Sequence, residues 1–553
     1  MRFLAEKTMA KIFIDKDRLQ SLLNVYDKKF ENKDYLGALL TVDSIEKASD
    51  DKAFIAVKRA KCYFEMGRYA QAVDEWFKYL NVVKSEKNYA RAYNALGACF
   101  FKMDDEKVAS YYFNRQIMSD KKAVFDYSYV TAEFFESMLS TDKNYYLAYP
   151  FDKADMTATL KEAEDLLKGG DYDGALNILS IIPESSKFYA TSLITTSIAK
   201  YFKGDAQGAI EDIERSISLE PNVISVCNAI SMFTAEKMDE KAEKYMELLK
   251  NLPVTSGEDV YKISMIYCER GDDETACSYA KTYLKENPYD APMLLLYGIM
   301  NYNLKRFETA EQSFLKAYQI TRSSVCKYYI DLIKKNRLER FEYTFDLQAE
   351  DRLKIMRKIG SFMKASSEER LIRQSEVYDL SAYAFYSNSY QLQSSIITLL
   401  GELATENAIE IMKKALISMS VYDRIKSGVL GFLTADGCDE EIGAVFGNVF
   451  RKIKFYKADF GAQDTVFTEA YAYVFAKLAP MEKDMKPIYL SAISIYEKIK
   501  EKGLLLEIKD VRSLSAVMYE LSSIAKIKSR REFANFFEGN LREIKRIKSL
   551  IQD

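Results

Sequence analysis

The chain has 553 residues, of which 48% are hydrophobic and 29% are charged, with only 21 glycines and 8 prolines. This composition is typical of a folded, mostly helical protein and excludes a collagen-like or largely disordered chain. The formal net charge of −3 argues against a nucleic-acid-binding protein, which usually carries a strong positive field. Histidine is absent, so the commonest routes of acid–base, nucleophilic and zinc catalysis are closed.

The length of the chain exceeds what one compact core supports, so several domains or an elongated array are expected. The first residues, MRFLAEKTMAKIFIDKDR, carry scattered charges and indicate no secretory signal. No stretch approaches the roughly 18 to 20 apolar residues of a membrane span. The seven cysteines are scattered and form no Cys-x-x-Cys pair, which favours small core residues in a reducing compartment. We therefore expect a soluble, cytoplasmic protein.

A polar or glycine-containing turn followed by a marker alanine recurs along the chain, as in GDAQGAIEDIERSISLEPN at residues 204–222. The residue numbers of the markers increase in steps of about 34, with one step close to twice that size between Ala109 and Ala175. A fixed period of this size predicts stacked helical hairpins, because one hairpin alone cannot bury its apolar face. The markers are Ala38, Ala72, Ala109, Ala175, Ala209, Ala242, Ala276 and Ala310.

Further small and aromatic residues keep the same register, in AKCYFEMGRYAQAVDEWFKYL at residues 60–80 and LLLYGIMNYNLKRFETAEQSFLKAYQI at residues 294–320. Pro221 and Pro288 stand at the same distance after their markers, Ala209 and Ala276. In these positions the chain resembles the tetratricopeptide repeat family. The resemblance implies an all-α solenoid of helical hairpins, in which small residues let paired helices approach closely and proline ends a hairpin.

The marker series divides the chain into five expected parts. An N-terminal extension covers residues 1–16, a first array residues 17–120, a second array residues 155–335 and a helical C-terminal domain residues 336–553. Between the arrays, residues 121–154 contain no clean hairpin and predict a degenerate helix at about 122–139 followed by an aromatic linker. The linker aromatics either pack the junction or form a ligand edge; they are Tyr145, Tyr146, Tyr149 and Phe151.

After the last marker the sequence changes character at residues 336–350, NRLERFEYTFDLQAE, where we place the start of the C-terminal domain. Leu-Gly-x-Leu occurs at 400–403 and 430–433, and Met412 and Leu416 are then matched by Ile442 and Phe446. With the pair Asp423–Arg424 near a helix start, this segment resembles short HEAT-type repeats; a non-repeating helical domain is the alternative. The basic end of the chain is expected to be a polar cap, with an anionic partner surface as the alternative.

No glycine-rich nucleotide loop and no Gly-x-Ser-x-Gly motif is present. Acidic clusters such as GDDET fall in the hairpin turns, where aspartate and glycine serve capping and turn chemistry. The sequence therefore predicts no catalytic residues, no cofactor and no metal.

The tetratricopeptide resemblance implies a concave surface lined by positions 2, 5, 6, 9, 12 and 13 of each first helix. Position 1 falls on Ala53 in the unit of the marker Ala72 and on Ala90 in the unit of Ala109. In the first array the lining forms a cationic, aromatic patch suited to an acidic or C-terminal peptide; ordinary solvated charge is the alternative. The family's carboxylate clamp is not expected, because its positions in the first unit carry other residues. The candidate peptide-binding residues are Phe54, Val57, Lys58, Lys61, Phe64, Arg91, Asn94, Phe101 and Lys102.

Three functions follow as hypotheses. The first is a non-catalytic scaffold or adaptor that binds peptide segments or partner domains on the concave surface. The second is a ligand-sensing regulator resembling bacterial peptide receptors that join a DNA-binding domain to tetratricopeptide repeats, although residues 1–33 are short for such a domain. The third is an enzyme with a site in residues 350–553, by analogy with glycosyltransferases that carry repeat arrays.

Overall fold

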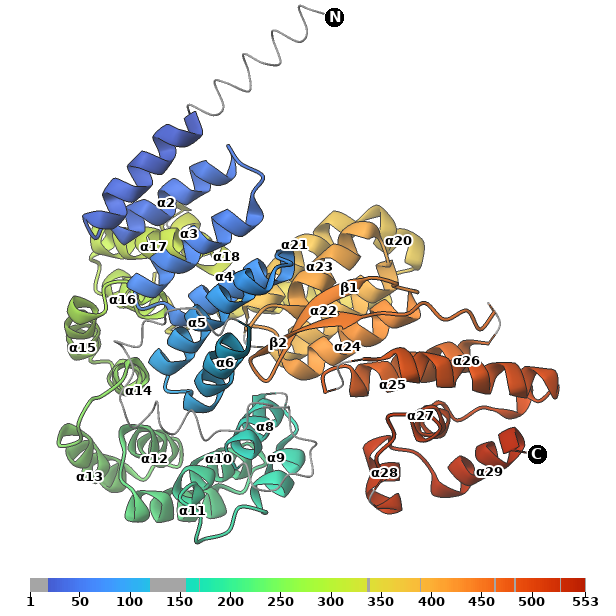
Figure 1. Cartoon of the computed structure of the whole chain (residues 1–553). Helices are drawn as coiled ribbons and strands as arrows, with labels where there is room; N and C mark the ends of the chain where they lie inside the picture. Colours follow the sequence, from blue (N-terminus) through green and yellow to red (C-terminus); the bar gives the residue numbers. More distant parts are fainter. Residues whose placement is uncertain are drawn as a thin grey trace, which may run out of the picture.

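The structure is a computed structural model that describes residues 18–119, 156–168, 170–335, 339–387, 389–461, 464–481, 484–527 and 529–552. Across these ranges the protein is almost entirely helical, and the helices of residues 18–119 and 156–321 follow one another as antiparallel pairs (Figure 1). The expected helix at 122–139, the linker aromatics Tyr145 to Phe151 and the N-terminal extension lie outside the described residues.

The first array consists of three helical hairpins. Residues 18–31 form the first helix, and the following helices are α2 (Tyr35–Glu46), α3 (Lys52–Glu65), α4 (Tyr69–Val82), α5 (Glu86–Lys102) and α6 (Glu106–Ser119).

The second array continues the same pairing through five further hairpins and one extra helix. Its helices are α8 (Met156–Lys168), α9 (Tyr172–Leu179), α10 (Tyr189–Phe202), α11 (Ala206–Leu219), α12 (Val223–Ala235), α13 (Asp239–Lys250), α14 (Gly257–Glu269), α15 (Asp273–Glu286), α16 (Ala291–Asn303), α17 (Phe307–Thr321) and α18 (Ser324–Lys335).

The eight marker alanines all lie on the second helix of a hairpin, and each is at most 2% exposed. Close approach of the paired helices explains the small residues on the first helices as well. A Cβ atom added to Gly298 would lie 2.4 Å from the ring of Phe314, and one added to Gly97 would lie 2.7 Å from the ring of Phe113. The structure thus confirms the repeat register predicted from sequence.

The turn residues act as predicted. Asp205 is the N-cap of α11, where its carboxylate accepts a hydrogen bond from the amide of Gly208 at 3.0 Å, which satisfies a helix-end donor. Pro221 stands between the end of α11 and the start of α12, so proline separates these two hairpins. All seven cysteines are free thiols, and all except Cys438 are buried.

The region after the second array is helical with one exception. Its elements are α19 (Ala349–Lys364), α20 (Ser367–Ile372), α21 (Gln374–Tyr386), α22 (Tyr390–Leu403), α23 (Glu406–Leu416), α24 (Asp423–Ala435), β1 (Glu441–Phe446), β2 (Val449–Lys454), α25 (Thr465–Leu478), α26 (Lys486–Glu501), the 3₁₀ turn η1 (Leu505–Glu507), α27 (Val511–Glu520), α28 (Arg530–Phe536) and α29 (Leu541–Gln552).

The expected second HEAT-type unit is wrong, because Ile442 and Phe446 lie on strand β1 and not on a helix. β1 and β2 form an antiparallel hairpin in which Phe446 pairs with Val449. The connecting residues Gly447 and Asn448 have φ of 53° and 64°, the left-handed backbone that a two-residue hairpin turn requires. Asp423 accepts a hydrogen bond from the amide of Gly447 at 2.7 Å, so it holds the hairpin turn.

The first array packs against the end of the second array, as Figure 1 shows for α2 and α3 beside α17. The hydroxyl of Tyr63 donates to the carbonyl of Ile320 at 3.2 Å, and the Arg322 guanidinium pairs with Asp43. Segments far apart in the sequence therefore meet, and the solenoid turns back on its own beginning.

The β-hairpin packs against the other side of the first array. Tyr112 donates its hydroxyl hydrogen to the carbonyl of Asn448 at 2.7 Å and accepts from the amide of Phe450 at 3.0 Å. Phe450 also stacks on Phe77, with ring centroids 6.1 Å apart. The first array consequently lies between the second array and the hairpin of the C-terminal region.

Candidate functional site

Three cations predicted to line the first-array surface lie close together. Lys58 pairs with Asp27 of the first helix at 2.9 Å, and its ammonium lies 4.1 Å from the ring centroid of Tyr26. Lys61 and Arg91 are exposed, and no ion pair joins either of them to a carboxylate in the described part of the chain. Partial burial, followed by the positive charges of Arg91 and Lys58, lowers the pKa of Lys61. This surface is thus a cluster of like charges flanked by two carboxylates, Asp27, which pairs with Lys58, and the exposed Glu65 one helical turn after Lys61 on α3.

Two of the other predicted residues differ from this cluster in burial or in position. Val57 is only 7% exposed and belongs to the core between α3 and α4, so little of its side chain is available to a peptide. Lys102 is exposed but lies three helical turns beyond Arg91 on α5, which at the helical rise places it about 16 Å further along the axis.

The remaining predicted residues are half-buried on α3 and α5. Phe54 packs on the core of the first hairpin, and Phe64 meets Tyr69 edge-on with centroids 5.3 Å apart. Asn94 donates to the side chain of Gln116 at 3.1 Å, and Phe101 packs against the core of α3 to α6. Their polar and aromatic groups therefore stabilise the repeat itself.

A second surface formed by first helices is occupied by the chain itself. Residues 339–348, called here the crossing segment, run without helix or strand between α18 and α19 and lie against the first helices α14, α16 and α18. The side chains at alternate positions 341, 343, 345 and 347 pack inward, as in an extended chain.

Asn303 at the end of α16 holds the backbone of the crossing segment. Its side-chain oxygen accepts from the amide of Phe341 at 2.8 Å, and its side-chain nitrogen donates to the carbonyl of Phe341 at 2.9 Å. The Phe341 ring is 1% exposed and stacks on Tyr302 with a centroid distance of 3.7 Å and an interplanar angle of 7°. One side chain therefore recognises both polar groups of an extended residue whose ring is fully buried.

Charge and further aromatic contacts fix the next residues. Arg340 pairs with Asp273 at 2.9 Å, and the hydroxyl of Tyr343 donates to the same carboxylate. Burial, followed by the hydrogen bond to Asp273, raises the pKa of Tyr343. The ring of Phe345 packs on Tyr261 with centroids 4.5 Å apart. The segment thus presents alternating aromatic side chains to a groove with one acidic group.

The end of the crossing segment is held by hydroxyl groups. Tyr329 on α18 donates to the carbonyl of Asp346 at 2.8 Å, and Tyr383 donates to the carboxylate of Asp346 at 2.7 Å. Gln348 donates to the Tyr329 hydroxyl at 2.7 Å. These bonds lead the chain directly into α19.

The residues of α14 and α16 that touch the crossing segment stand at positions that the tetratricopeptide resemblance assigns to a concave surface. With position 1 at Gly257 and at Ala291 in these two units, Tyr261 stands at position 5, Tyr302 at position 12 and Asn303 at position 13. Sequence reasoning placed a domain boundary at residues 336–350 and missed this contact. The alternation of Phe341, Tyr343 and Phe345 signalled an extended chain, but not which surface would receive it.

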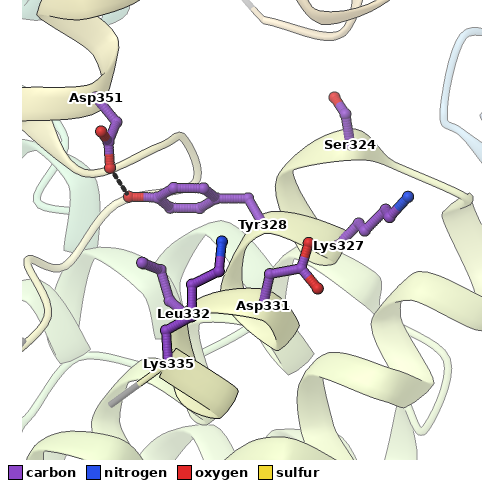
Figure 2. A pocket seen from close by; sticks show the side chains of 7 residues that line it. All are labelled: Ser324, Lys327, Tyr328, Asp331, Leu332, Lys335 and Asp351. Carbon is purple, nitrogen blue, oxygen red and sulfur yellow. Dashed lines mark hydrogen bonds between the residues drawn. The ribbon is translucent and has the colours of Figure 1, made fainter. Parts of the chain in front are cut away.

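A separate polar depression of about 330 Å³ lies beside α18 and the start of α19 (Figure 2). The hydroxyl of Tyr328 donates to Asp351 at 2.6 Å, and burial followed by this bond raises the pKa of Tyr328. None of the residues predicted to bind a peptide lies here. Its lining is Ser324, Lys327, Tyr328, Asp331, Leu332, Lys335 and Asp351.

Among the described residues, no cluster of three or more histidine, cysteine, aspartate or glutamate side chains is arranged to bind a metal ion. No helix there has both the length and the apolar character needed to cross a bilayer.

No protein-family model matches the chain, and no curated protein matches it in sequence. Several solved structures are similar in part. The P58(IPK) TPR domain is 13% identical, with 57% of this chain and 98% of that chain covered and a TM-score of 0.19. Yeast Tom70 is 13% identical, with 97% and 96% covered and a TM-score of 0.20. The Cut9–Hcn1 hetero-tetramer of the APC/C is 13% identical, with 74% and 98% covered and a TM-score of 0.25.

The spacing and packing of the hairpins in this chain identify the type of repeat. Hairpins follow one another with the period of about 34 residues that is typical of tetratricopeptide units. Marker alanines are buried on every second helix, and small residues face the aromatic rings of the paired helix. The protein is therefore a tetratricopeptide-repeat protein in fold, with helical hairpins over residues 18–119 and 156–321.

Proposed function

We propose that this protein is a non-catalytic interaction scaffold whose concave repeat surfaces bind extended polypeptide segments. The crossing segment carries the proposal, because an extended stretch of this same chain lies on concave positions and has its backbone held by Asn303. A rigid array of repeats suits such a task, since neighbouring hairpins present one continuous surface.

The surface proposed for a partner is the charged face of the first array. Lys61 and Arg91 are exposed, they lie close to Lys58, and their mutual repulsion favours an anionic ligand. An acidic extended segment would neutralise this cluster through charge-assisted hydrogen bonds. In this proposal residues 17–120 and 155–335 are two arrays, residues 336–553 form a C-terminal domain that supplies further surface, and the protein is cytoplasmic.

A peptide array tests the proposal. The wild-type chain is incubated with acidic decapeptides and with their amide counterparts, in parallel with the double variant Lys61→Glu Arg91→Glu. Binding to acidic peptides is expected to fall at least tenfold in the double variant. An extended decapeptide spans about 33 Å and can reach Lys102, which lies about 16 Å from Arg91, so the single variant Lys102→Glu measures how much this cation adds to the binding.

A control variant has the same change in net charge, but its two substitutions lie on second helices. Lys244 on α13 and Lys281 on α15 are exposed, so the variant Lys244→Glu Lys281→Glu should bind like the wild type. Equal loss of binding in both double variants would show a general effect of net charge and would contradict the proposed surface.

A further inference from the structure

One side of α19 carries a row of exposed apolar residues, called here the α19 stripe. Leu353, Met356 and Met363 are 50%, 48% and 39% exposed, and with Gly360 they stand three or four residues apart, so they share one side of the helix. No heavy atom lies within 4 Å of a Cβ atom added to Gly360. Single exposed apolar residues are ordinary on a protein surface, whereas a contiguous group of them marks an interaction site.

The opposite side of α19 fixes the helix to the rest of the C-terminal region. Ile359 and Phe362 are buried, and the Lys358 ammonium pairs with Glu376 of α21 at 2.7 Å. The Arg373 guanidinium lies over the ring of Phe362, 4.6 Å from its centroid. The α19 stripe therefore belongs to a helix that is already held in place, so a partner does not have to order it on binding.

The spacing of the α19 stripe is that of one strand of a coiled coil. Leu353 and Gly360 take position a of a heptad, and Met356 and Met363 take position d. A second helix can therefore lay its own apolar side along α19. Methionine suits such a contact, because its flexible side chain adapts to the shape of its neighbours.

Two cations border the α19 stripe and determine the charge of the partner. Arg357 and Lys364 both take position e, about 10 Å apart along the helix, and both are exposed. Neither forms an ion pair with a carboxylate among the described residues, whereas the neighbouring Lys354 pairs with Glu350 at 2.8 Å. Residues at position e form ion pairs with the partner helix across a coiled coil, so acidic residues are favoured there.

A second copy of this chain fits the α19 stripe less well. Arg357 lies near the centre of the stripe, so in a symmetric antiparallel pair it faces its own counterpart, and like charges repel. In a parallel pair the facing g positions are Arg352 and Ile359, which offer no carboxylate. Charge complementarity therefore favours a different, acidic helix as the partner.

We propose that the α19 stripe is a docking surface for an amphipathic helix of a partner protein, whose apolar side covers Leu353, Met356 and Met363 and whose acidic residues pair with Arg357 and Lys364. This surface lies in the C-terminal region, outside the repeat hairpins. It takes a helix, whereas the proposed function places extended segments on the arrays, so neither proposal depends on the other.

Fluorescence anisotropy with the full chain tests this surface. The probes are two labelled peptides of three heptads with leucine at positions a and d, one carrying glutamate and the other lysine at positions e and g. Wild-type protein is expected to bind the acidic peptide at least tenfold more tightly than the basic one. The variant Arg357→Glu Lys364→Glu should reverse this preference, a result that a loss of folding cannot produce.

Matched variants separate this site from general effects of charge and hydrophobicity. Lys414→Glu Lys498→Glu has the same change in net charge at exposed residues of α23 and α26 and should keep the wild-type preference. Leu353→Gln Met356→Gln should weaken binding of the acidic peptide at least tenfold. Leu490→Gln, at a residue of α26 that is 54% exposed, should leave that binding unchanged.

Three results would overturn the proposed docking surface. They are no binding or equal binding of the two peptides by the wild type, an unchanged preference in Arg357→Glu Lys364→Glu, and a wild-type dimer in sedimentation velocity that Leu353→Gln Met356→Gln converts to a monomer. The last result would mean that a second copy covers the α19 stripe. None of them affects the binding of acidic decapeptides by the first array, which tests the proposed function separately.

Discussion

Two surfaces of this molecule are built from first helices in the same way, but one is covered by the crossing segment and the other is exposed to solvent. The groove of α14, α16 and α18 is filled by the crossing segment, with Phe341 only 1% exposed. The face of α3 and α5 presents Lys61 and Arg91 to solvent. The repeat geometry provides the place where an extended segment can lie. The side chains at those positions then select which sequence binds there. Rings and one asparagine hold an aromatic segment, and we propose that the clustered cations bind an acidic one.

The largest effect is expected at the filled groove. Phe341→Ala removes a buried ring that stacks on Tyr302, so it should lower the free energy of unfolding by about 3 to 5 kcal/mol. Urea denaturation followed by circular dichroism measures this loss. The control Phe202→Ala removes a ring that is 63% exposed and should cost far less. Equal losses would mean that the crossing segment is not part of the core.

A smaller loss is expected when the backbone contact is removed. Asn303→Ala breaks both hydrogen bonds to Phe341 and leaves polar groups unpaired, which should cost about 1 to 3 kcal/mol. The same denaturation experiment applies, with Asn287→Ala as the control at an exposed site. A loss for Asn303→Ala no larger than that of an ordinary surface substitution, about 0.5 kcal/mol, would contradict the role given to Asn303.

The folding stability is expected to depend on pH through a carboxyl group at the contact between the first array and the C-terminal region. Asp74 accepts from the amide of Met419 at 2.9 Å, and burial raises the pKa of Asp74 from 3.8 to about 6. Because the folded pKa is higher than the unfolded one, ionisation destabilises the fold as the pH rises from about 4 to 6, and the penalty is constant above that range.

Asp74→Asn removes this ionisation. Relative to the wild type, the variant should be more stable at pH 7.5 than at pH 4.5, as measured by thermal unfolding at both values. A stability difference that does not change with pH would show that Asp74 titrates at its ordinary value.

The smallest effect on stability is expected on the charged face of the first array. Lys61→Met removes a charge that Arg91 and Lys58 repel, and exposed substitutions of this kind usually change stability by less than about 0.5 kcal/mol. Urea denaturation of Lys61→Met and Phe341→Ala under the same conditions compares their losses of unfolding free energy. A loss as large as that of Asn303→Ala would mean that Lys61 supports the fold and that the two surfaces do not differ as described.

Local signals in the sequence predicted the repeat, because a marker such as Ala209 must be small wherever two helices touch. The β-hairpin also had a signal, since Gly447-Asn448 between two apolar runs is typical of a two-residue turn; the repeat interpretation of 430–446 obscured it. The crossing segment could not be located from sequence. Phe341 and Asn303 belong to separate elements of the chain, and only the folded solenoid brings them together.

Binding of extended polypeptide to the repeat surfaces, as proposed above, can be measured by an experiment in trans. A synthetic peptide of residues 339–349 is titrated into the wild-type chain and into the variant Tyr343→Ala Phe345→Ala, whose own crossing segment has lost two of its ring contacts while Phe341 is kept. We predict measurable binding to the variant and none to the wild type, whose groove is filled. Binding to neither protein, with the variant shown to be folded by circular dichroism, would contradict the account.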